Sequence, residues 1–308
     1  QPVAPHGDKA SCGCALLAGK QQLAHVSAGG APVAAAAPRA GRLISPTPAP
    51  RPLASSLVDT RGSSPVAELC WLNDHSRQVL ENPDGRYFES YDTEGARYEY
   101  DLVSSFRIDV PLKSGGDILV FAKIKVIKQG LVSDSEVEVA KERLLRGIDR
   151  GLNNKFLLQV IDEPCGARDY PIRYAVEFVA AGEDYVMELH SSLDPAEVVG
   201  NTIYVSVDTD AWVHLHEFMH CLGLPDEYME LGETAKTIKF FMPNLILSPE
   251  TVVTRNSRSE SDPEATLMSD YHHTTLKPRH AWNIGLEVQE LLSREIGREV
   301  VCLVTCCP

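Results

Sequence analysis

The chain has 308 residues, of which 44% are hydrophobic, so it is long enough for one sizeable domain and an appendage. Its formal net charge of −14 argues against nucleic acid or an anionic membrane surface as the main partner, because both need a basic face. No stretch approaches the roughly 18 apolar residues that a membrane helix needs, so we expect no membrane insertion, and no signal peptide is visible.

Composition divides the chain into three parts. Residues 28–63 are rich in Ala, Pro, Gly and Ser, and up to about residue 56 they contain almost no large apolar side chains. Such a segment cannot bury enough surface to offset the entropy lost on ordering, so we expect a flexible linker. It separates a short N-terminal piece, residues 1–27, from an expected domain over residues 64–308.

The pattern of residues 64–308 indicates an α+β domain. Short apolar runs, several of them with period two, predict strands over residues 106–112, 118–128, 172–180, 185–190 and 203–207. The third and fourth of these strands are expected to form a hairpin around Gly182. Ser133 and Glu136 have the spacing of a capping box and predict the start of a helix.

Two further helices are predicted in the second half of the chain. Asp210 is expected to cap a helix over residues 211–222, and Gly223 is expected to end it. A later helix is predicted over residues 279–294, where apolar residues recur on one side.

The predicted helix before Gly223 carries His216, Glu217 and His220. Histidines four positions apart lie on one helical face, where both imidazoles can reach a single Zn²⁺. Glu217 can lie beside the reacting water and act as a general base. Gly223 can adopt the left-handed conformation that turns the chain back, so that Asp226 can face the metal as a third ligand.

This spacing, HExxHxxGxxD, resembles the metzincin clan of metallopeptidases in its variant with an aspartate ligand, as in bacterial snapalysin-like proteases. The resemblance covers residues 203–292 and implies the two histidines and Asp226 as zinc ligands, with Glu217 as the base. It also implies a methionine turn beneath the metal, for which Met268 is the candidate. The implied fold is zincin-like, with a twisted mixed sheet, an active-site helix and a C-terminal helix.

Four other residues are alternative or accessory candidates. Glu227 adjoins Asp226, so either could be the third ligand, and the more distant Glu264 could serve as in gluzincin-like zincins. Tyr271 follows the candidate methionine by three residues, where some metzincins place a transition-state tyrosine at two. His280 opens the last predicted helix, where it could cap the helix or donate to the oxyanion.

The reaction that the resemblance implies is hydrolysis of a peptide bond. Zn²⁺ lowers the pKa of a bound water towards about 7 and polarises the scissile carbonyl. Glu217 would take the proton from the water and pass it to the leaving amine. We therefore expect a zinc-dependent endopeptidase that acts on a protein or peptide substrate.

The N-terminal sequence Pro-His-Gly-Asp-Lys, followed by a Cys-Gly step, resembles the closing part of PAAR-repeat proteins. Those proteins tip the spike of the bacterial type VI secretion system. In that family His and Cys residues bind a structural zinc, and His6 and Cys12 are the positions here that could take part. The rest of such a domain would lie before Gln1, and a complete domain could hold this structural zinc as a second zinc besides the catalytic one. The alternative is a polar turn with incidental cysteines.

The two resemblances together imply a specialised type VI effector with a spike-tip module, a linker and an enzyme. Such a toxin, antibacterial or anti-host, would be secreted through that system and act in the target cell, with the periplasm favoured. Its partners would be the spike protein, through the PAAR-like segment, and a cognate immunity protein. The alternatives are a spike-tip structural or adaptor protein with a non-catalytic zincin-like domain, and a secreted nutritional protease.

The cysteines do not form a dense disulfide framework, because the eight of them are scattered along the chain. The cluster from Cys302 to Cys307 lacks a standard metal spacing. A disulfide from this cluster to Cys70 or Cys165 would suit delivery to an oxidising compartment. Cys221 is expected to be a small buried packing residue.

Overall fold

The computed structural model describes residues 70–193, 195–229, 234–243, 250–254, 264–269 and 274–307. The predictions for the N-terminal piece, with His6 and Cys12, and for the linker lie outside these residues, as does Tyr271.

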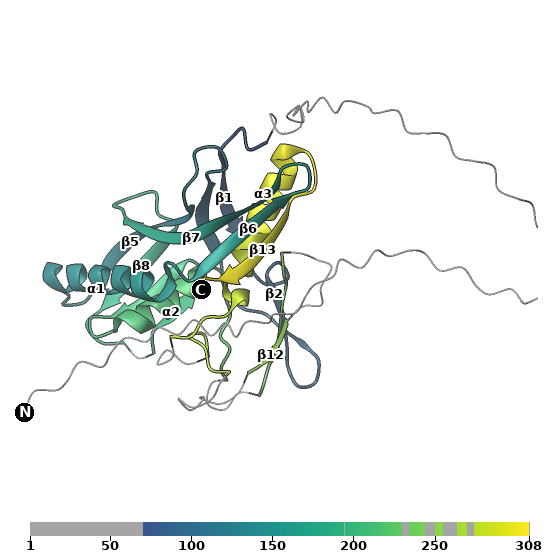
Figure 1. The fold of residues 1–308 in the computed structure, drawn as a ribbon. Helices are drawn as coiled ribbons and strands as arrows, with labels where there is room; N and C mark the ends of the chain where they lie inside the picture. Colours follow the sequence, from purple (N-terminus) through teal and green to yellow (C-terminus); the bar gives the residue numbers. More distant parts are fainter. Residues whose placement is uncertain are drawn as a thin grey trace, which may run out of the picture. The chain divides into compact units, whose positions relative to one another are not determined.

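The described residues form a mixed α/β structure built on one large sheet (Figure 1). The strands of this sheet are β1 (His75–Glu81), β4 (Ser104–Val110), β5 (Ile118–Gln129), β6 (Phe156–Asp162), β7 (Gly166–Phe178), β8 (Tyr185–His190), β9 (Glu197–Val199), β10 (Thr202–Ser206) and β13 (Val301–Cys306). Their order is β13-β6-β7-β5-β8-β10-β9, and β4 joins β5 and carries β1. Strands β5, β7, β8 and β10 are parallel and the others antiparallel, so the sheet is mixed, as predicted.

The apolar runs on either side of Gly182 do not form the predicted hairpin. Strands β7 and β8 both run parallel to β5 and pair with its first and second halves. Their connection passes the middle of β5, where the amides of Val179 and Asp184 donate to β5 carbonyls at 3.0 and 2.9 Å. The prediction was wrong because a period-two pattern identifies a strand and its buried face, but not its neighbour in the sheet.

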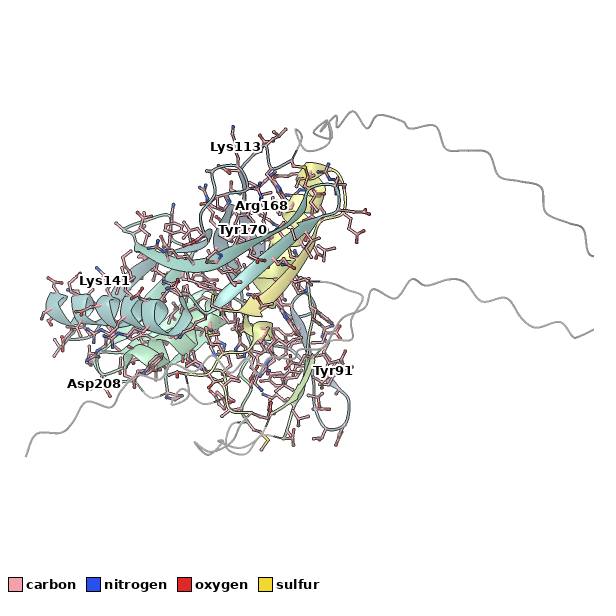
Figure 2. All side chains as sticks on the ribbon, in the orientation of Figure 1. Tyr91, Lys113, Lys141, Arg168, Tyr170 and Asp208 are labelled. Atoms are coloured by element: carbon pink, nitrogen blue, oxygen red, sulfur yellow. A yellow bond between two sulfur atoms is a disulfide. The ribbon has the colours of Figure 1, made fainter. Side chains whose placement is uncertain are left out.

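Three α-helices accompany the sheet in the described part of the chain, and all three were predicted. They are α1 (Asp134–Gly147), α2 (Ala211–Cys221) and α3 (Trp282–Ile296). The capping box of α1 is present, since the Glu136 amide donates to the Ser133 hydroxyl at 3.3 Å and the Ser133 amide donates to the Glu136 carboxylate at 2.7 Å. Figure 2 marks Lys141 on α1 and Asp208 in the turn that leads into α2.

Two glycines allow α1 and the π-helical turn after it (Ile148–Leu152) to pack closely against α2. A Cβ on Gly147 would lie 2.3 Å from the carbonyl oxygen of Ala211. A Cβ on Gly151 would lie 2.3 Å from Cδ2 of Leu215. Any larger residue would push α2 away, so these glycines set the position of the helix that carries the two histidines. The other side of α2 contacts β4, β9 and β10.

A smaller sheet and α3 complete the described structure. The small sheet has the order β12-β11-β2-β3, with β2 (Phe88–Tyr91), β3 (Arg97–Tyr98), β11 (Thr237–Phe240) and β12 (Glu250–Val253). Helix α3 follows a 3₁₀ turn, Pro278–Ala281, and packs against β1 and β13. The Asn283 side chain donates to the carbonyl of Leu222 at 2.5 Å, so α3 also holds the C-terminal end of α2. None of the helices described has the length and apolar character to cross a membrane.

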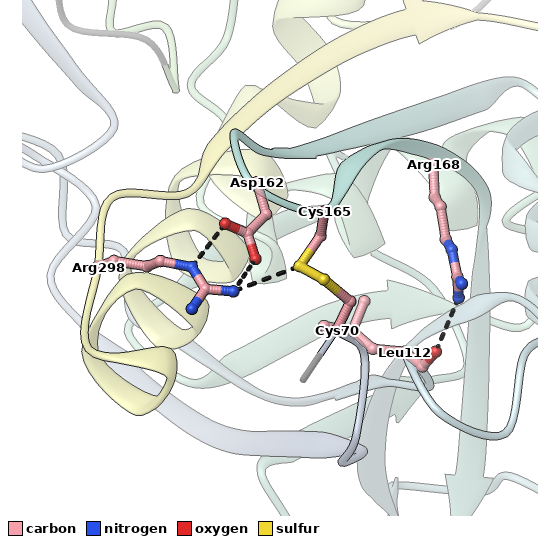
Figure 3. The surroundings of a disulfide bond; sticks show 6 residues. All are labelled: Cys70, Leu112, Asp162, Cys165, Arg168 and Arg298. Carbon is pink, nitrogen blue, oxygen red and sulfur yellow. Dashed lines mark hydrogen bonds and ion pairs between the residues drawn. A yellow bond between two sulfur atoms is a disulfide. The ribbon is translucent and has the colours of Figure 1, made fainter. Parts of the chain in front are cut away.

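A disulfide joins Cys70 to Cys165, across a sequence separation of 95 residues (Figure 3). The Arg298 guanidinium lies beside it, donating to the Cys165 sulfur at 3.3 Å and pairing with the Asp162 carboxylate. The expected bridge from the C-terminal cluster to either of these cysteines was therefore wrong. Cys302 is instead fully buried in β13, where the strand alternation turns its thiol into the core.

The Cys70–Cys165 bond is expected to be a large contributor to stability. Replacing both cysteines with Ser should lower the free energy of unfolding by about 4–5 kcal/mol, because a loop of roughly 100 residues would no longer be closed in the unfolded chain. Urea denaturation of the oxidised proteins measures this difference. A loss below about 1 kcal/mol would mean that the bond does not restrain the unfolded chain.

Candidate metal centre

Helix α2 positions two histidines that face the same point. It begins at its N-cap Asp210, whose carboxylate accepts the amides of Trp212 and Val213 at 2.7 and 3.0 Å. His216 and His220 follow on one face, one helical turn apart, and their side chains are 5% and 8% exposed. Their Nε2 atoms lie 3.2 Å from each other.

Asp226 completes a cluster of three side chains. Its Oδ1 lies 3.0 Å from Nε2 of His216 and 3.2 Å from Nε2 of His220. These are the three residues that the described part of the chain brings together as a group able to hold a metal ion. The structure thus places the three proposed ligands at one point.

The turn at Gly223 brings Asp226 to the histidines. Gly223 has a φ of +88°, the left-handed conformation that the sequence predicted. Its amide donates to the carbonyl of His220 at 2.8 Å, which closes the end of α2. A Cβ at this position would lie 2.3 Å from Oγ of Ser104 and 2.8 Å from Cβ of Pro83. Glycine is therefore required here both for its conformation and for the close packing.

The other nitrogen of each imidazole is held by a backbone carbonyl. Nδ1 of His216 donates to the carbonyl of Leu267 at 2.9 Å, and Nδ1 of His220 donates to that of Leu224 at 2.7 Å. Neutral imidazoles held in this way direct their Nε2 lone pairs at each other and at the Asp226 carboxylate. Three electron-rich atoms at such distances repel unless a cation or a shared proton lies among them.

The dimensions of the cluster fit a zinc ion. Bonds of about 2.0–2.1 Å in tetrahedral geometry separate neighbouring ligand atoms by roughly 3.3 Å. The three separations among the cluster atoms, 3.0, 3.2 and 3.2 Å, are close to this value. Two imidazoles and one carboxylate also leave a fourth position open, as catalytic zinc sites do.

The charges of the cluster are strongly coupled. Burial opposes the charged form of His220, but the Asp226 carboxylate outweighs this and raises the pKa of His220 to about 9. Burial also opposes the charged form of Asp226 and by itself would raise the pKa of this carboxyl group. The two imidazoles outweigh burial, so the pKa of Asp226 lies below its usual value. The pocket therefore stabilises positive charge beside Asp226, whether the charge is a proton or a metal ion.

Glu217 lies beside the cluster without belonging to it. Its side chain is buried, and its Oε2 has no hydrogen-bond partner among the described residues. Burial raises the pKa of this carboxyl group, although His216 and His220 act in the opposite direction. A buried carboxylate with an unused acceptor and a raised pKa suits a general base.

Met268 lies in a turn over residues 267–269 and is fully buried. The carbonyl before it, that of Leu267, holds His216. Its own carbonyl accepts the amide of Glu227 at 2.8 Å. The turn thus contacts both a histidine and the segment that carries Asp226.

Glu227 lies away from the cluster, and so does His280. The Glu227 carboxylate accepts Nε and Nη2 of Arg279, each at 2.7 Å, and the hydroxyl of Thr266 at 2.7 Å. His280 is buried and donates to the same carboxylate at 3.1 Å. The structure therefore does not support Glu227 as a metal ligand or His280 as a substrate contact, since Glu227 forms a buried ion pair with Arg279 and His280 donates a hydrogen bond to the same carboxylate. Glu264 is exposed and pairs with Lys277.

Replacing Glu227 with Gln should lower the free energy of unfolding by about 3–5 kcal/mol, because it leaves the buried Arg279 undercompensated. Burial opposes the charge of Glu227, but Arg279 and His280 lower its pKa well below the ordinary 4.5. The wild-type stabilisation should therefore be present above pH 4.5 and be lost as the pH falls through the depressed folded-state pKa. Denaturation at pH 7 and at lower pH measures both effects.

The matched control for this change is Glu264→Gln, which alters an exposed ion pair and should cost less than about 1 kcal/mol. Equal losses for the two variants would contradict the role assigned to Glu227.

A cleft of about 190 Å³ opens above the cluster. It is lined by His216, Glu217, His220 and Asp226, by Tyr228, by residues 100–102, and by residues 195–199, which include β9. Sequence reasoning missed Tyr228, whose ring centre lies 6.2 Å from that of His216. Its position two residues after Asp226 was the feature of the sequence that could have indicated it. The lips of the cleft carry no motif and could not be found from the sequence.

No family model, curated protein or solved structure matches the chain.

Proposed function

We propose that this chain is a zinc-dependent endopeptidase with a metzincin-like site. The observation that carries the proposal is the convergence of three lone-pair atoms from His216, His220 and Asp226, with separations of 3.0–3.2 Å that suit one tetrahedral metal ion. The buried acceptor of Glu217, which lines the same cleft, supports a catalytic rather than a structural metal.

His216, His220 and Asp226 would hold the metal. When bound, Zn²⁺ supplies Lewis-acid polarisation of the scissile carbonyl and makes water more acidic. Glu217 accepts the proton of the attacking water at its free carboxylate oxygen and returns it to the leaving amine. The carbonyls of Leu267 and Leu224 keep both imidazoles oriented during this cycle.

The cleft suits an extended polypeptide as substrate. Strand β9 is the last in the sheet order and forms one lip of the cleft. An extended peptide can add to such an edge through main-chain hydrogen bonds, which bring a peptide bond to the site without regard to its side chains. This supports a protein or peptide substrate over a small molecule.

The biological role that we propose is that of a type VI toxin acting in the target cell, with the periplasm favoured. The Cys70–Cys165 disulfide supports an oxidising compartment, because such bonds persist there and are rare in the cytosol. The PAAR-like sequence supports delivery on the spike, with an immunity protein as the protective partner. The alternative remains an adaptor whose zincin-like domain only binds, and the presence of Glu217 favours the enzyme.

The test uses the full chain stripped of metal with a chelator and then titrated with Zn²⁺. Cleavage of an unfolded protein such as reduced casein should appear at one equivalent of zinc and disappear again with the chelator. Expression in recipient bacteria should be more toxic when the chain is exported to the periplasm. Stoichiometric zinc binding with no cleavage of any protein or peptide would favour the adaptor.

A further inference from the structure

The cleft above the metal cluster is strongly acidic. Besides Glu217 and Asp226, two further carboxylates line it, those of Asp101 and Glu197. No Lys or Arg is among the described residues that line the cleft. A positive metal ion would offset part of the charge near Asp226, but Asp101 and Glu197 lie on the lips and are exposed. Their charge is therefore available to a bound ligand.

The two lips that carry these acids are held to each other. The amide of Gly200, just after β9, donates to the carbonyl of Asp101 at 2.9 Å, and Leu102 forms a bridge with Gly200. Glu197 is fixed by the pairing of β9 with β10, in which it lies opposite Tyr204. The acidic groups thus come from a built rim and not from a loose surface loop.

Strand β9 also offers an apolar surface beside the acid. Glu197 and Val199 are two positions apart, so they project from the same face of the strand. Both line the cleft, and Val199 is 42% exposed. An aliphatic stem that ends in a cation matches this combination, because the stem covers the apolar residue while the charged head meets the carboxylate.

A second observation indicates that the cleft receives a ligand. Glu217 is among the residues that line the cleft, and its Oε2 atom is buried and has no hydrogen-bond partner among the described residues. A buried carboxylate oxygen without a hydrogen-bond partner lowers the stability of the fold. In native proteins such a group needs an explanation, and use by a ligand or a reaction is one. The acidic lips therefore border a site that is open to a ligand.

We propose that the cleft selects polypeptides with a Lys or Arg residue next to the scissile bond, and that Asp101 and Glu197 are the residues that determine this specificity. The inference rests on the proposed peptidase function and adds to it the class of substrate. The net charge of −14 agrees with this inference, because it attracts basic polypeptides to the protein at low ionic strength.

The test compares pairs of otherwise uncharged ten-residue peptides that contain Arg or its neutral isostere citrulline, with this residue placed in turn at each of four positions around the centre. Binding is measured by fluorescence anisotropy with the zinc-loaded Glu217→Gln chain, and cleavage with the zinc-loaded wild type. For at least one position, the Arg peptide should bind about tenfold more tightly than its citrulline partner. The preference should shrink as salt is raised, because salt screens the charges.

The double substitution Asp101→Asn and Glu197→Gln should reduce the preference for Arg to near one, and each single substitution should reduce it in part. The matched control replaces two exposed acids outside the cleft, Asp117→Asn and Glu163→Gln, and should keep the preference. Both double variants change the net charge equally. A difference between their preferences for Arg therefore depends on where the acids lie and not on the overall charge.

The possible outcomes separate this inference from the proposed function. Cleavage without any preference for Arg, or a preference that survives the double substitution, would overturn the inference and leave the peptidase intact. Binding that prefers Arg through Asp101 and Glu197, with no cleavage by the wild type, would support the inference for the cleft while the catalytic function fails.

Discussion

Replacing Glu217 with Gln is expected to lower kcat for peptide cleavage by about 10²–10⁴-fold, the usual contribution of a general base. The amide has nearly the same shape as the carboxylate, but it cannot take the proton of the attacking water. Glu217 is not a member of the metal cluster, so the zinc content should stay at one equivalent. Kinetics and metal analysis on the same preparation measure the two quantities together.

The variant is expected to fold at least as stably as the wild type. Burial disfavours the charged form of Glu217 and raises its pKa, and a neutral amide carries less of that cost. Glu163→Gln, the same change at an exposed position away from the cleft, is the matched control and should retain full activity. Undiminished cleavage by the Glu217 variant, with zinc bound, would show that another group is the base.

The second large effect is expected at Asp226. Its replacement with Ala should weaken zinc binding by at least about 100-fold, because the loss of an outer-shell partner alone typically costs 10–100-fold and Asp226 would contact the metal directly. The Glu227 carboxylate is not available as a substitute, since both of its oxygens accept hydrogen bonds from Arg279. Competition with a chromophoric chelator measures the affinity.

The metal-free form of the Asp226 variant offers a second readout. The carboxylate raises the pKa of His220 to about 9 against the effect of burial. Without Asp226, burial should predominate and the pKa of His220 should fall below its ordinary value of 6.5, as followed by NMR titration of the ring. Asp117→Asn, at the exposed residue just before β5, should change neither the zinc affinity nor this pKa. Full zinc affinity in Asp226→Ala would place the third ligand elsewhere.

The amino-acid sequence by itself determined the parts of the site that depend on short-range geometry. His216 and His220 share a face because the helix has a fixed period, and Asp210 caps that helix through its neighbours' amides. Gly223 adopts a left-handed conformation, which residues with a Cβ disfavour and glycine does not. All of these interactions join residues within a few positions of each other, so the chain's local preferences suffice to predict them.

Only the tertiary structure decided between Asp226 and Glu227. The two are adjacent carboxylates, and no local rule separates them. Arg279, about fifty residues later, pairs with Glu227 and leaves Asp226 for the histidines. The same partner network buries His280, which the sequence had offered as a substrate contact.

The arrangement of the sheet and the lips of the cleft also depended on distant contacts. Strands β7 and β8 are neighbours in sequence, yet both pair with β5, and the pattern of apolar residues is the same for either arrangement. Cys70 forms its disulfide with Cys165 and not with the C-terminal cluster, because the fold brings residue 70 beside the turn between β6 and β7. Asp101 and Glu197 share a cleft through the contact of Gly200 with Asp101. Such pairings arise from packing over long sequence separations, which local propensity and spacing do not specify.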